Sequence, residues 1–257
     1  MIKAKLPIEL KLNSSDDLIR IGRDIDGGYL VSIKDVTNTE ILISMGICDD
    51  WSFEQEFLRY AEVPIIAYDA SVGFNVFFSK FLLACLRFYK PDLIFKSLGT
   101  LISYLIFFRK NKVHIQKFVS CKVRENASHN SLYTTIEEIF KKTKSNKIFL
   151  KIDIEGSEYR ILESILKNQN RISGLIIEFH EADLNIDLIK KFISTTNLNL
   201  VHIHGNNTGV IIKGDQFPTS LEITLSKYST PSKKFTSPHP LDKPNDPKIK
   251  DISLIFE

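Results

Sequence analysis

Short apolar runs rich in Ile, Leu and Val alternate with amphipathic segments from residue 40 to residue 226. Apolar runs of this kind are typical of strands that are buried on both faces of a parallel sheet. The segments between them carry apolar side chains at helical spacing, three and four residues apart. This alternation predicts an α/β fold. We expect strands at 40–47, 64–69, 115–123, 147–153, 174–179, 199–204 and 220–226.

One edge of the predicted sheet should differ from the rest. Only the Gly- and Asn-rich loop 205–214 separates the last two expected strands, so they should pair as an antiparallel hairpin. A mainly parallel, seven-stranded sheet that ends in such a hairpin is typical of Rossmann-like domains. The expected helices are 52–61, 74–88 with a partner that reaches residue 109, 135–143, 158–167 and 185–195.

The chain has 257 residues, enough for one α/β domain with a large core, and we expect a single domain over 1–257. Three segments lie outside the regular alternation. They are an N-terminal extension at 1–39, an apolar and basic helical insertion at 74–112, and a C-terminal arm at 228–257. The arm is dense in Pro, Ser and Lys, so it should run extended over the domain and end in a short strand at 252–256.

Charge is concentrated in the helical insertion. The chain is 43% apolar and 25% charged, which excludes a disordered chain and a multispan membrane protein. Its net charge of +3 is uneven, because residues 74–117 carry eight Lys and Arg against one acid and leave −4 on the remainder. In the same segment Phe74, Phe77, Phe78 and Phe81 follow helical spacing.

This insertion admits two interpretations. Core packing or a homodimer interface explains an apolar helical pair. Peripheral contact with an anionic membrane surface or a lipid-linked substrate would also explain the excess of Lys and Arg. No nucleic-acid-binding module is recognisable, so nucleic acid is not an expected partner.

The cysteines and the N-terminal segment bear on location. Cys48, Cys85 and Cys121 are widely spaced and odd in number, which argues for reduced thiols and against a disulfide framework. The N-terminal segment lacks the long apolar stretch of a secretory signal. The longest apolar run, 98–108, is shorter than the about 20 residues that cross a bilayer. We expect a cytoplasmic protein, peripheral to the inner face of the membrane if the insertion binds lipid.

The first candidate site is the strand-to-helix turn in the segment ILISMGICDDWSFE. Gly46 at the strand end lets a ligand approach the backbone, and Asp49 and Asp50 lead into a helix N-terminus. Asp69 ends the next strand, where an acidic residue in a Rossmann-like sheet accepts hydrogen bonds from ribose hydroxyls. An ordinary helix cap and a solvated carboxylate are the alternatives, because no GxGxxG fingerprint is present.

Two neighbouring strands each end in titratable side chains. Asp153 and Glu155 follow the apolar strand in FLKIDIEGSEYRIL, and Glu178 and His180 end the next strand in GLIIEFHEAD. Carboxylates at a strand end are costly to bury unless they bind something or face water. The cluster could act as a general base on an acceptor hydroxyl, bind a divalent ion, or both. The alternative is that these groups cap helices and pair with nearby Lys and Arg.

Two further polar segments could contribute to the same site. VHIHGNNTG places His204 and Asn206 after the sixth strand, where either could contact the acceptor or a metal. A Gly-Asn-Asn turn is the alternative, because these residues tolerate left-handed backbone angles. In RIGRDIDGGYLV, Arg23 could hold a carboxylate or phosphate, although a hairpin with a salt-bridged face explains it as well.

Together these motifs resemble the FkbM-type family of S-adenosylmethionine-dependent methyltransferases. FLKIDIEGSEYRIL and GLIIEFHEAD carry the resemblance, and RIGRDIDGGYLV, SMGICDDWSFE, VHIHGNN and LDKPNDP extend it over most of the chain. The resemblance implies a Rossmann-like fold, bound S-adenosylmethionine, and O-methylation of a hydroxyl on a sugar, glycan or secondary metabolite. The chain departs from the family pattern in its less Gly-rich cofactor loop and in its helical insertion.

The resemblance also implies roles for single residues. The expected cofactor contacts are Gly46, Asp49, Asp50, Asp69, Asn126, Ser128 and Asp153. His180 is the expected catalytic base because imidazole titrates near neutrality, and Asp153 and Glu178 would orient it. The expected metal ligands, suited to Mg²⁺ or Mn²⁺ better than to zinc, are Asp153, Glu178 and His204. The expected substrate contacts are Glu155, Asn206 and Arg23.

Two other functions fit the same fold. One is a nucleotide-sugar enzyme or dehydrogenase, but the chain has neither GxGxxG nor a Tyr-x-x-x-Lys pair. The other is a non-catalytic protein that binds a glycan or a membrane surface. Binding of S-adenosylmethionine distinguishes the methyltransferase from both.

Overall fold

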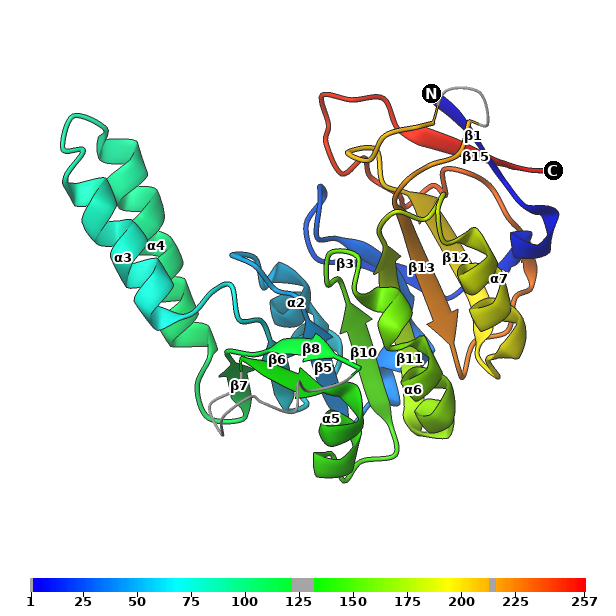
Figure 1. Ribbon diagram of the computed structural model, residues 1–257, viewed down its shortest axis with the longest axis horizontal. Coiled ribbons are helices and arrows are strands. Elements are labelled where there is room, and N and C mark those ends of the chain that lie inside the picture. Colours follow the sequence, from blue (N-terminus) through cyan, green and yellow to red (C-terminus); the bar gives the residue numbers. More distant parts are fainter. Residues whose placement is uncertain (1, 122–131, 213–215) are drawn as a thin grey trace.

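The computed structural model describes residues 2–121, 132–212 and 216–257, which are built around one seven-stranded sheet (Figure 1). The strand order is β12-β13-β11-β10-β5-β6-β7. All neighbouring strands are parallel except β13, which is antiparallel to both β11 and β12. The predicted α/β class with a terminal antiparallel hairpin is therefore confirmed. The strands are β5 (Ile41–Met45), β6 (Ile65–Tyr68), β7 (Lys112–Ile115), β10 (Ile148–Ile152), β11 (Ile172–Phe179), β12 (Asn199–Gly205) and β13 (Leu221–Ser226).

Helices cover both faces of the sheet. Successive residues of a strand point to opposite faces, so each strand packs against helices on both sides. Ile148, Leu150 and Ile152 of β10 pack toward α5, α6 and α7, whereas Phe149 between them packs toward α1 and α2. These helices are α1 (Ile33–Thr37), α2 (Ser52–Tyr60), α5 (Ile136–Lys142), α6 (Leu162–Asn168) and α7 (Ile186–Thr195). Short 3₁₀ helices occur at Ile8–Leu10, Glu158–Arg160 and Gln169–Arg171.

A helical hairpin projects from the sheet at the predicted insertion (Figure 1). It consists of α3 (Phe74–Cys85) and α4 (Pro91–Phe107). An aromatic cluster fixes its base, where the ring of Trp51 lies 5.9 Å from those of Phe77 and Tyr104, measured between centroids. Further out, no side chain between Ala84 and Leu101 is buried. Within the described ranges, no helix has the length and apolar character that a bilayer span requires.

Four two-stranded sheets hold most of the remaining described segments. They are β1 (Ile2–Leu6) with β15 (Ile252–Phe256), β2 (Asn13–Ser14) with β14 (Lys233–Lys234), β3 (Leu18–Ile21) with β4 (Tyr29–Ser32), and β8 (Phe118–Ser120) with β9 (Tyr133–Thr135). The first two sheets join the N-terminal extension to the C-terminal arm, so these distant parts of the sequence lie side by side (Figure 1). The expected strand at 252–256 is confirmed.

The third expected strand, 115–123, had the wrong bounds. β7 ends at Ile115 because the chain turns there, with the Lys117 amide donating to the Ile115 carbonyl at 2.7 Å. The side-chain amide of Gln116 fixes the turn by donating to the Val72 carbonyl at 2.8 Å. β8 then starts at Phe118 and leaves the main sheet. The segment IQKFVSCKV contains no Gly or Pro that would reveal such a turn in the sequence.

Candidate functional site

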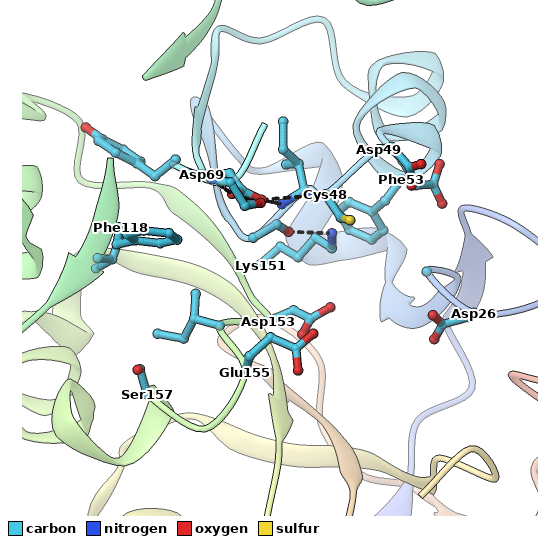
Figure 2. A pocket seen from close by; sticks show the side chains of 18 of the residues that line it. Asp26, Cys48, Asp49, Phe53, Asp69, Phe118, Lys151, Asp153, Glu155 and Ser157 are labelled. Carbon is cyan, nitrogen blue, oxygen red and sulfur yellow. Dashed lines mark hydrogen bonds between the residues drawn. The ribbon is translucent and has the colours of Figure 1, made fainter. Parts of the chain in front are cut away.

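A cavity of about 580 Å³ lies at the carboxyl ends of β5, β6 and β10, where ligands bind in open α/β sheets (Figure 2). Five of the seven expected cofactor contacts line it, namely Gly46, Asp49, Asp50, Asp69 and Asp153. The other two, Asn126 and Ser128, lie outside the described residues. The cavity is also lined by Phe118, which the turn after β7 brings to its wall.

The turn after β5 requires glycine. Gly46 has a φ of +80°, and a Cβ at this position would lie 1.7 Å from the carbonyl oxygen of Asp153. The amide of Asp153 in turn donates to the Met45 carbonyl at 2.9 Å. Glycine therefore allows the ends of β5 and β10 to approach each other at the wall of the cavity.

Asp69 holds the same turn from the end of β6. One of its carboxylate oxygens accepts hydrogen bonds from the Ile47 and Cys48 amides at 3.0 and 2.8 Å, and the other accepts from Ser71 (Figure 2). Burial alone would raise the pKa of Asp69, but these hydrogen bonds favour the charged form and leave its pKa lowered. Asp69 is thus an ionised anchor of the turn. A ribose hydroxyl that bound Asp69 would have to donate to carboxylate oxygens that already accept these hydrogen bonds.

Arg23 pairs with Asp50 across the same cavity. The guanidinium lies 3.1 Å from the carboxylate, and both side chains line the cavity. Asp50 also accepts a hydrogen bond from the Ser52 amide at 3.0 Å, at the start of α2. β3 and β4 pair on either side of the loop that carries Arg23, so the hairpin expected as the alternative explanation for Arg23 is present. Arg23 nevertheless lies beside the cavity.

Lys151 and Glu54 belong to the cavity region but were not identified from the sequence. Lys151 is nearly buried on β10, with its Nζ 3.7 Å from Glu54 and 3.3 Å from the carbonyl oxygen of Gly46. Burial alone would lower the pKa of Lys151, but the charges of Glu54 and Asp153 leave it raised. A cation therefore lies beside the Gly46 turn. The lone lysine in the apolar run FLKI was the signal that could have located it.

A second cavity, of about 480 Å³, adjoins the first and shares Asp26, Asp153 and Glu155 with it. Its other walls carry hydrogen-bonding side chains, among them Glu178, His180, Asn206, Thr208 and Ser220. The structure therefore joins the acid cluster expected at the ends of β10 and β11 with the Asn206 turn that follows β12.

His180 lies among four carboxylates. Its Nδ1 is 3.2 Å from Glu158, a fully buried side chain in the turn after β10. Its Nε2 is 3.6 Å from Glu155, 3.8 Å from Glu178 and 3.9 Å from Asp153. Burial alone would lower the pKa of His180, but the hydrogen bond to Glu158 and the surrounding negative charge raise it to about 9. The imidazole is therefore protonated at neutral pH.

Glu178 lies at the wall of the second cavity and is almost fully buried. Its carboxylate accepts hydrogen bonds from Asn206 and Ser220, both at 2.8 Å. The Tyr29 hydroxyl lies 3.4 Å from both Glu178 and Asp153. Burial, and then the charge of neighbouring carboxylates, raises the pKa of Glu178 to about 8, and burial raises that of Asp153 to about 6. The cluster therefore exchanges protons near neutral pH.

The structure corrects the expected metal set of Asp153, Glu178 and His204. Both ring nitrogens of His204 are engaged, with Nδ1 3.0 Å from Glu222 and Nε2 3.0 Å from Asp251. His204 does not join the cluster because the antiparallel strand β13 separates β12 from β11. In the described part of the chain, the groups whose ligand atoms lie within 4.8 Å of one another are Asp153 with Glu155 and His180, and Asp26 with Glu178 and Glu222.

A model of the methyltransferase FkbM domain matches residues 126–199. The matched segment includes β10 and β11 with Asp153, Glu155, Glu178 and His180, and the match confirms the resemblance to this family over that segment. It supports a methyltransferase, a family whose methyl donor is S-adenosylmethionine. No curated protein matches the sequence.

Two solved structures show the level of structural similarity. An rRNA methylase from Streptococcus thermophilus is similar with a TM-score of 0.40 at 12% identity, over 76% of this chain and 93% of that one. A precorrin-6y C5,15-methyltransferase from Geobacter metallireducens is similar with a TM-score of 0.38 at 10% identity, over 74% and 81% of the two chains. Similarity this low carries no information about the substrate.

Proposed function

We propose that the chain is an S-adenosylmethionine-dependent O-methyltransferase that acts on a hydroxyl of a sugar, a glycan or a secondary metabolite. The observation that carries the proposal is the pair of adjoining cavities that share Asp26, Asp153 and Glu155. One cavity has the size and strand-end position of a cofactor site. The other is lined by groups that hydrogen-bond to hydroxyls. Donor and acceptor would therefore meet at the shared carboxylates.

The first cavity suits S-adenosylmethionine in charge and shape. When bound, this cofactor supplies an electrophilic methyl group on a positively charged sulfonium. Asp153 and Glu155 place negative charge where the cavities meet, which favours a cation there. Phe118 and Tyr133 line the cavity with ring centroids 5.7 Å apart, and such an aromatic wall suits a planar base. Asp69 remains ionised to accept hydrogen bonds from a ribose.

His180 is the proposed base. Methyl transfer forms a C–O bond and breaks a C–S bond, so the acceptor hydroxyl has to lose its proton, and Nε2 of deprotonated His180 would take it. Glu158 would hold the ring through Nδ1 and stabilise the imidazolium that results. Glu178 and Asn206 would position the acceptor in the second cavity, because alignment of the two reacting groups supplies much of the rate.

Proton removal by His180 makes a divalent cation unnecessary in this proposal. We therefore expect activity to be unchanged after treatment with EDTA, measured as methyl transfer before and after chelation. Activity that EDTA abolishes and Mg²⁺ or Mn²⁺ restores would contradict this and favour a cation held by Asp153, Glu155 and His180.

Calorimetric titration with S-adenosylmethionine and S-adenosylhomocysteine tests the proposal. We expect micromolar binding that Asp69→Ala weakens about tenfold or more, because the substitution removes a charged anchor of the Gly46 turn. Asp24→Ala removes an exposed carboxylate that lines neither cavity and is the matched control. No binding by the unaltered chain would overturn the proposal and favour a nucleotide-sugar enzyme or a non-catalytic binding protein.

A further inference from the structure

The surface of the α3–α4 hairpin is rich in exposed apolar side chains. At its tip Leu86 is 75% exposed and Phe88 is 81% exposed. Exposed apolar surface of this extent marks a site of interaction. Of the 25 large apolar side chains that are exposed among the described residues, the hairpin carries twelve, namely Phe74, Phe78, Leu82, Leu83, Leu86, Phe88, Tyr89, Leu93, Phe95, Ile102, Leu105 and Ile106.

The two flanks of α3 differ in character. Phe78 and Leu82 are four residues apart on α3 and share one flank, whereas Lys80, two residues after Phe78, lies on another. Because each residue turns the helix by about 100°, the basic flank lies roughly opposite the apolar flank. This arrangement is typical of helices that lie in a membrane interface, with apolar side chains in the acyl boundary and cations at the headgroups.

A groove of about 310 Å³ between the two helices carries the basic side chains. Lys80 lines it from α3, Arg87 from the turn that follows α3, and Lys96 from α4. Within the described ranges, none of the three forms a salt bridge. Among the described residues, Asp49 is the only acidic side chain that lines the groove, and it also lines the first cavity. The groove therefore has a strong positive charge and adjoins the candidate site.

We propose that the hairpin docks on the surface of an anionic lipid bilayer. Its apolar flank would enter the interface, and Lys80, Arg87 and Lys96 would contact the headgroup phosphates. This inference goes beyond methyl transfer and does not depend on what the cavities bind. It would hold the cofactor cavity next to the membrane, because the aromatic cluster around Trp51 fixes the base of the hairpin beside that cavity.

The charge distribution favours lipid over a second copy of the chain. The hairpin carries four basic residues, Lys80, Arg87, Lys90 and Lys96, against one acid, Asp92, so a two-fold contact between hairpins would bring like charges together. An anionic surface attracts the same charges. Outside residues 74–117, a range that also holds four basic residues just beyond α4, the chain carries −4 and is repelled by that surface, which would orient the hairpin toward the membrane.

Vesicle co-sedimentation of the full chain tests the proposal. We expect about tenfold or more stronger binding to vesicles of mixed phosphatidylglycerol and phosphatidylcholine than to phosphatidylcholine alone, with a loss of binding in added salt. Phe78→Ser combined with Ile102→Ser should weaken binding by removing apolar contact. K80E/R87E/K96E should abolish the preference for anionic vesicles. All five side chains lie outside the buried core, so thermal melting should show folded variants.

Matched controls place the same changes elsewhere on the surface. Leu184→Ser with Leu188→Ser removes two exposed apolar side chains, and K141E/K142E/K144E reverses three exposed charges at α5. Both controls should bind vesicles like the unaltered chain. Equal binding to the two kinds of vesicle would overturn the proposal. A second outcome would also overturn it: the chain does not bind vesicles, and light scattering shows a dimer that Phe78→Ser with Ile102→Ser dissociates. This outcome would favour a second copy of the chain as the occupant of the hairpin surface.

Discussion

The protonation of His180 is controlled by the turn after β10. One oxygen of the buried Glu158 carboxylate accepts hydrogen bonds from the amides of Ile154 and Gly156 at 3.0 and 3.2 Å, and lies 3.2 Å from His180 Nδ1. These contacts hold the carboxylate in one orientation beneath the ring. A fixed negative charge at this distance favours the imidazolium, which raises the pKa of His180 to about 9 despite its burial.

Glu158→Gln should therefore lower the pKa of His180, because it removes the charge and keeps the shape. In the unaltered enzyme a base with this pKa gains activity as pH rises toward about 9. The variant should reach full activity at lower pH, with its affinity for S-adenosylmethionine unchanged. The pH dependence of kcat measures this, and Glu163→Gln on the exposed side of α6 is the control. Identical pH profiles would contradict a His180 base whose pKa is set by Glu158.

Side chains at strand ends could be predicted from the sequence, but their partners could not. Asp153 and His180 come together because the carboxyl ends of adjacent parallel strands meet at one edge of the sheet. Glu158 lies in the next turn, and only the backbone angles of that turn bring its carboxylate under the ring. Lys151 depends on Glu54, which is on a helix almost one hundred positions away in the sequence. Neither contact has a spacing that would reveal it.

Among the elements, the turn between β5 and α2 has a geometry that requires glycine. Gly46 and Gly156 both have positive φ, +80° and +90°, so alanine at either position costs roughly 1 to 2 kcal/mol in backbone strain. Only at Gly46 does the added Cβ meet another atom, the Asp153 carbonyl oxygen at 1.7 Å. At Gly156 nothing lies within 4 Å of it. A comparison of alanine substitutions at the two glycines therefore distinguishes the cost of backbone strain, which both share, from the cost of close contact, which only Gly46 has.

We expect Gly46→Ala to destabilise the fold more than Gly156→Ala and to weaken cofactor binding, because it pushes the ends of β5 and β10 apart. The further loss should be about 2 kcal/mol, in the range of an overpacked core. Thermal unfolding gives the first effect and calorimetric titration gives the second. If both variants lost the same stability and kept their cofactor affinity, close approach at Gly46 would not matter for the site.

Elements with strong periodicity were predicted well, and breaks within them were not. The hydrophobic pattern indicated the parallel strands, the terminal hairpin and the helical pair α3–α4. It also merged β7 with β8, because the Ile115–Lys117 turn uses ordinary residues and is fixed by a distant carbonyl, that of Val72. A turn without Gly or Pro leaves no local signal.

At the scale of the whole molecule, the C-terminal arm is tied to the sheet by buried polar contacts. His204 on β12 lies 3.0 Å from Glu222 on β13 and 3.0 Å from Asp251 in the arm. Asn245, also in the arm, donates to Asp26 and Glu222 at 3.1 and 2.6 Å, so the arm supports a wall of the second cavity. The composition of residues 228–257 predicted an extended arm but could not indicate which part of the sheet it contacts.

The charge on His204 makes this attachment dependent on pH. Burial alone would lower the pKa of His204, but Asp251 and Glu222 raise it well above 6.5. A histidine with a raised pKa contributes stability that is fully present below its unfolded pKa and is lost as pH rises through its folded pKa. The free energy of unfolding that His204 contributes should therefore be largest in mildly acidic or neutral solution and smallest in alkaline solution.

His204→Gln should lower the free energy of unfolding by about 3 kcal/mol at neutral pH, because it leaves the buried Glu222 and the partly buried Asp251 without the imidazolium between them. The loss of unfolding free energy should be smaller in alkaline solution, because His204 of the unaltered chain is then also uncharged. Urea unfolding at both pH values measures the difference, with Lys250→Gln, an exposed substitution in the same arm, as the control. A loss that stays constant with pH would mean that the shape and neutral hydrogen bonds of His204, and not its charge, hold the arm on the sheet.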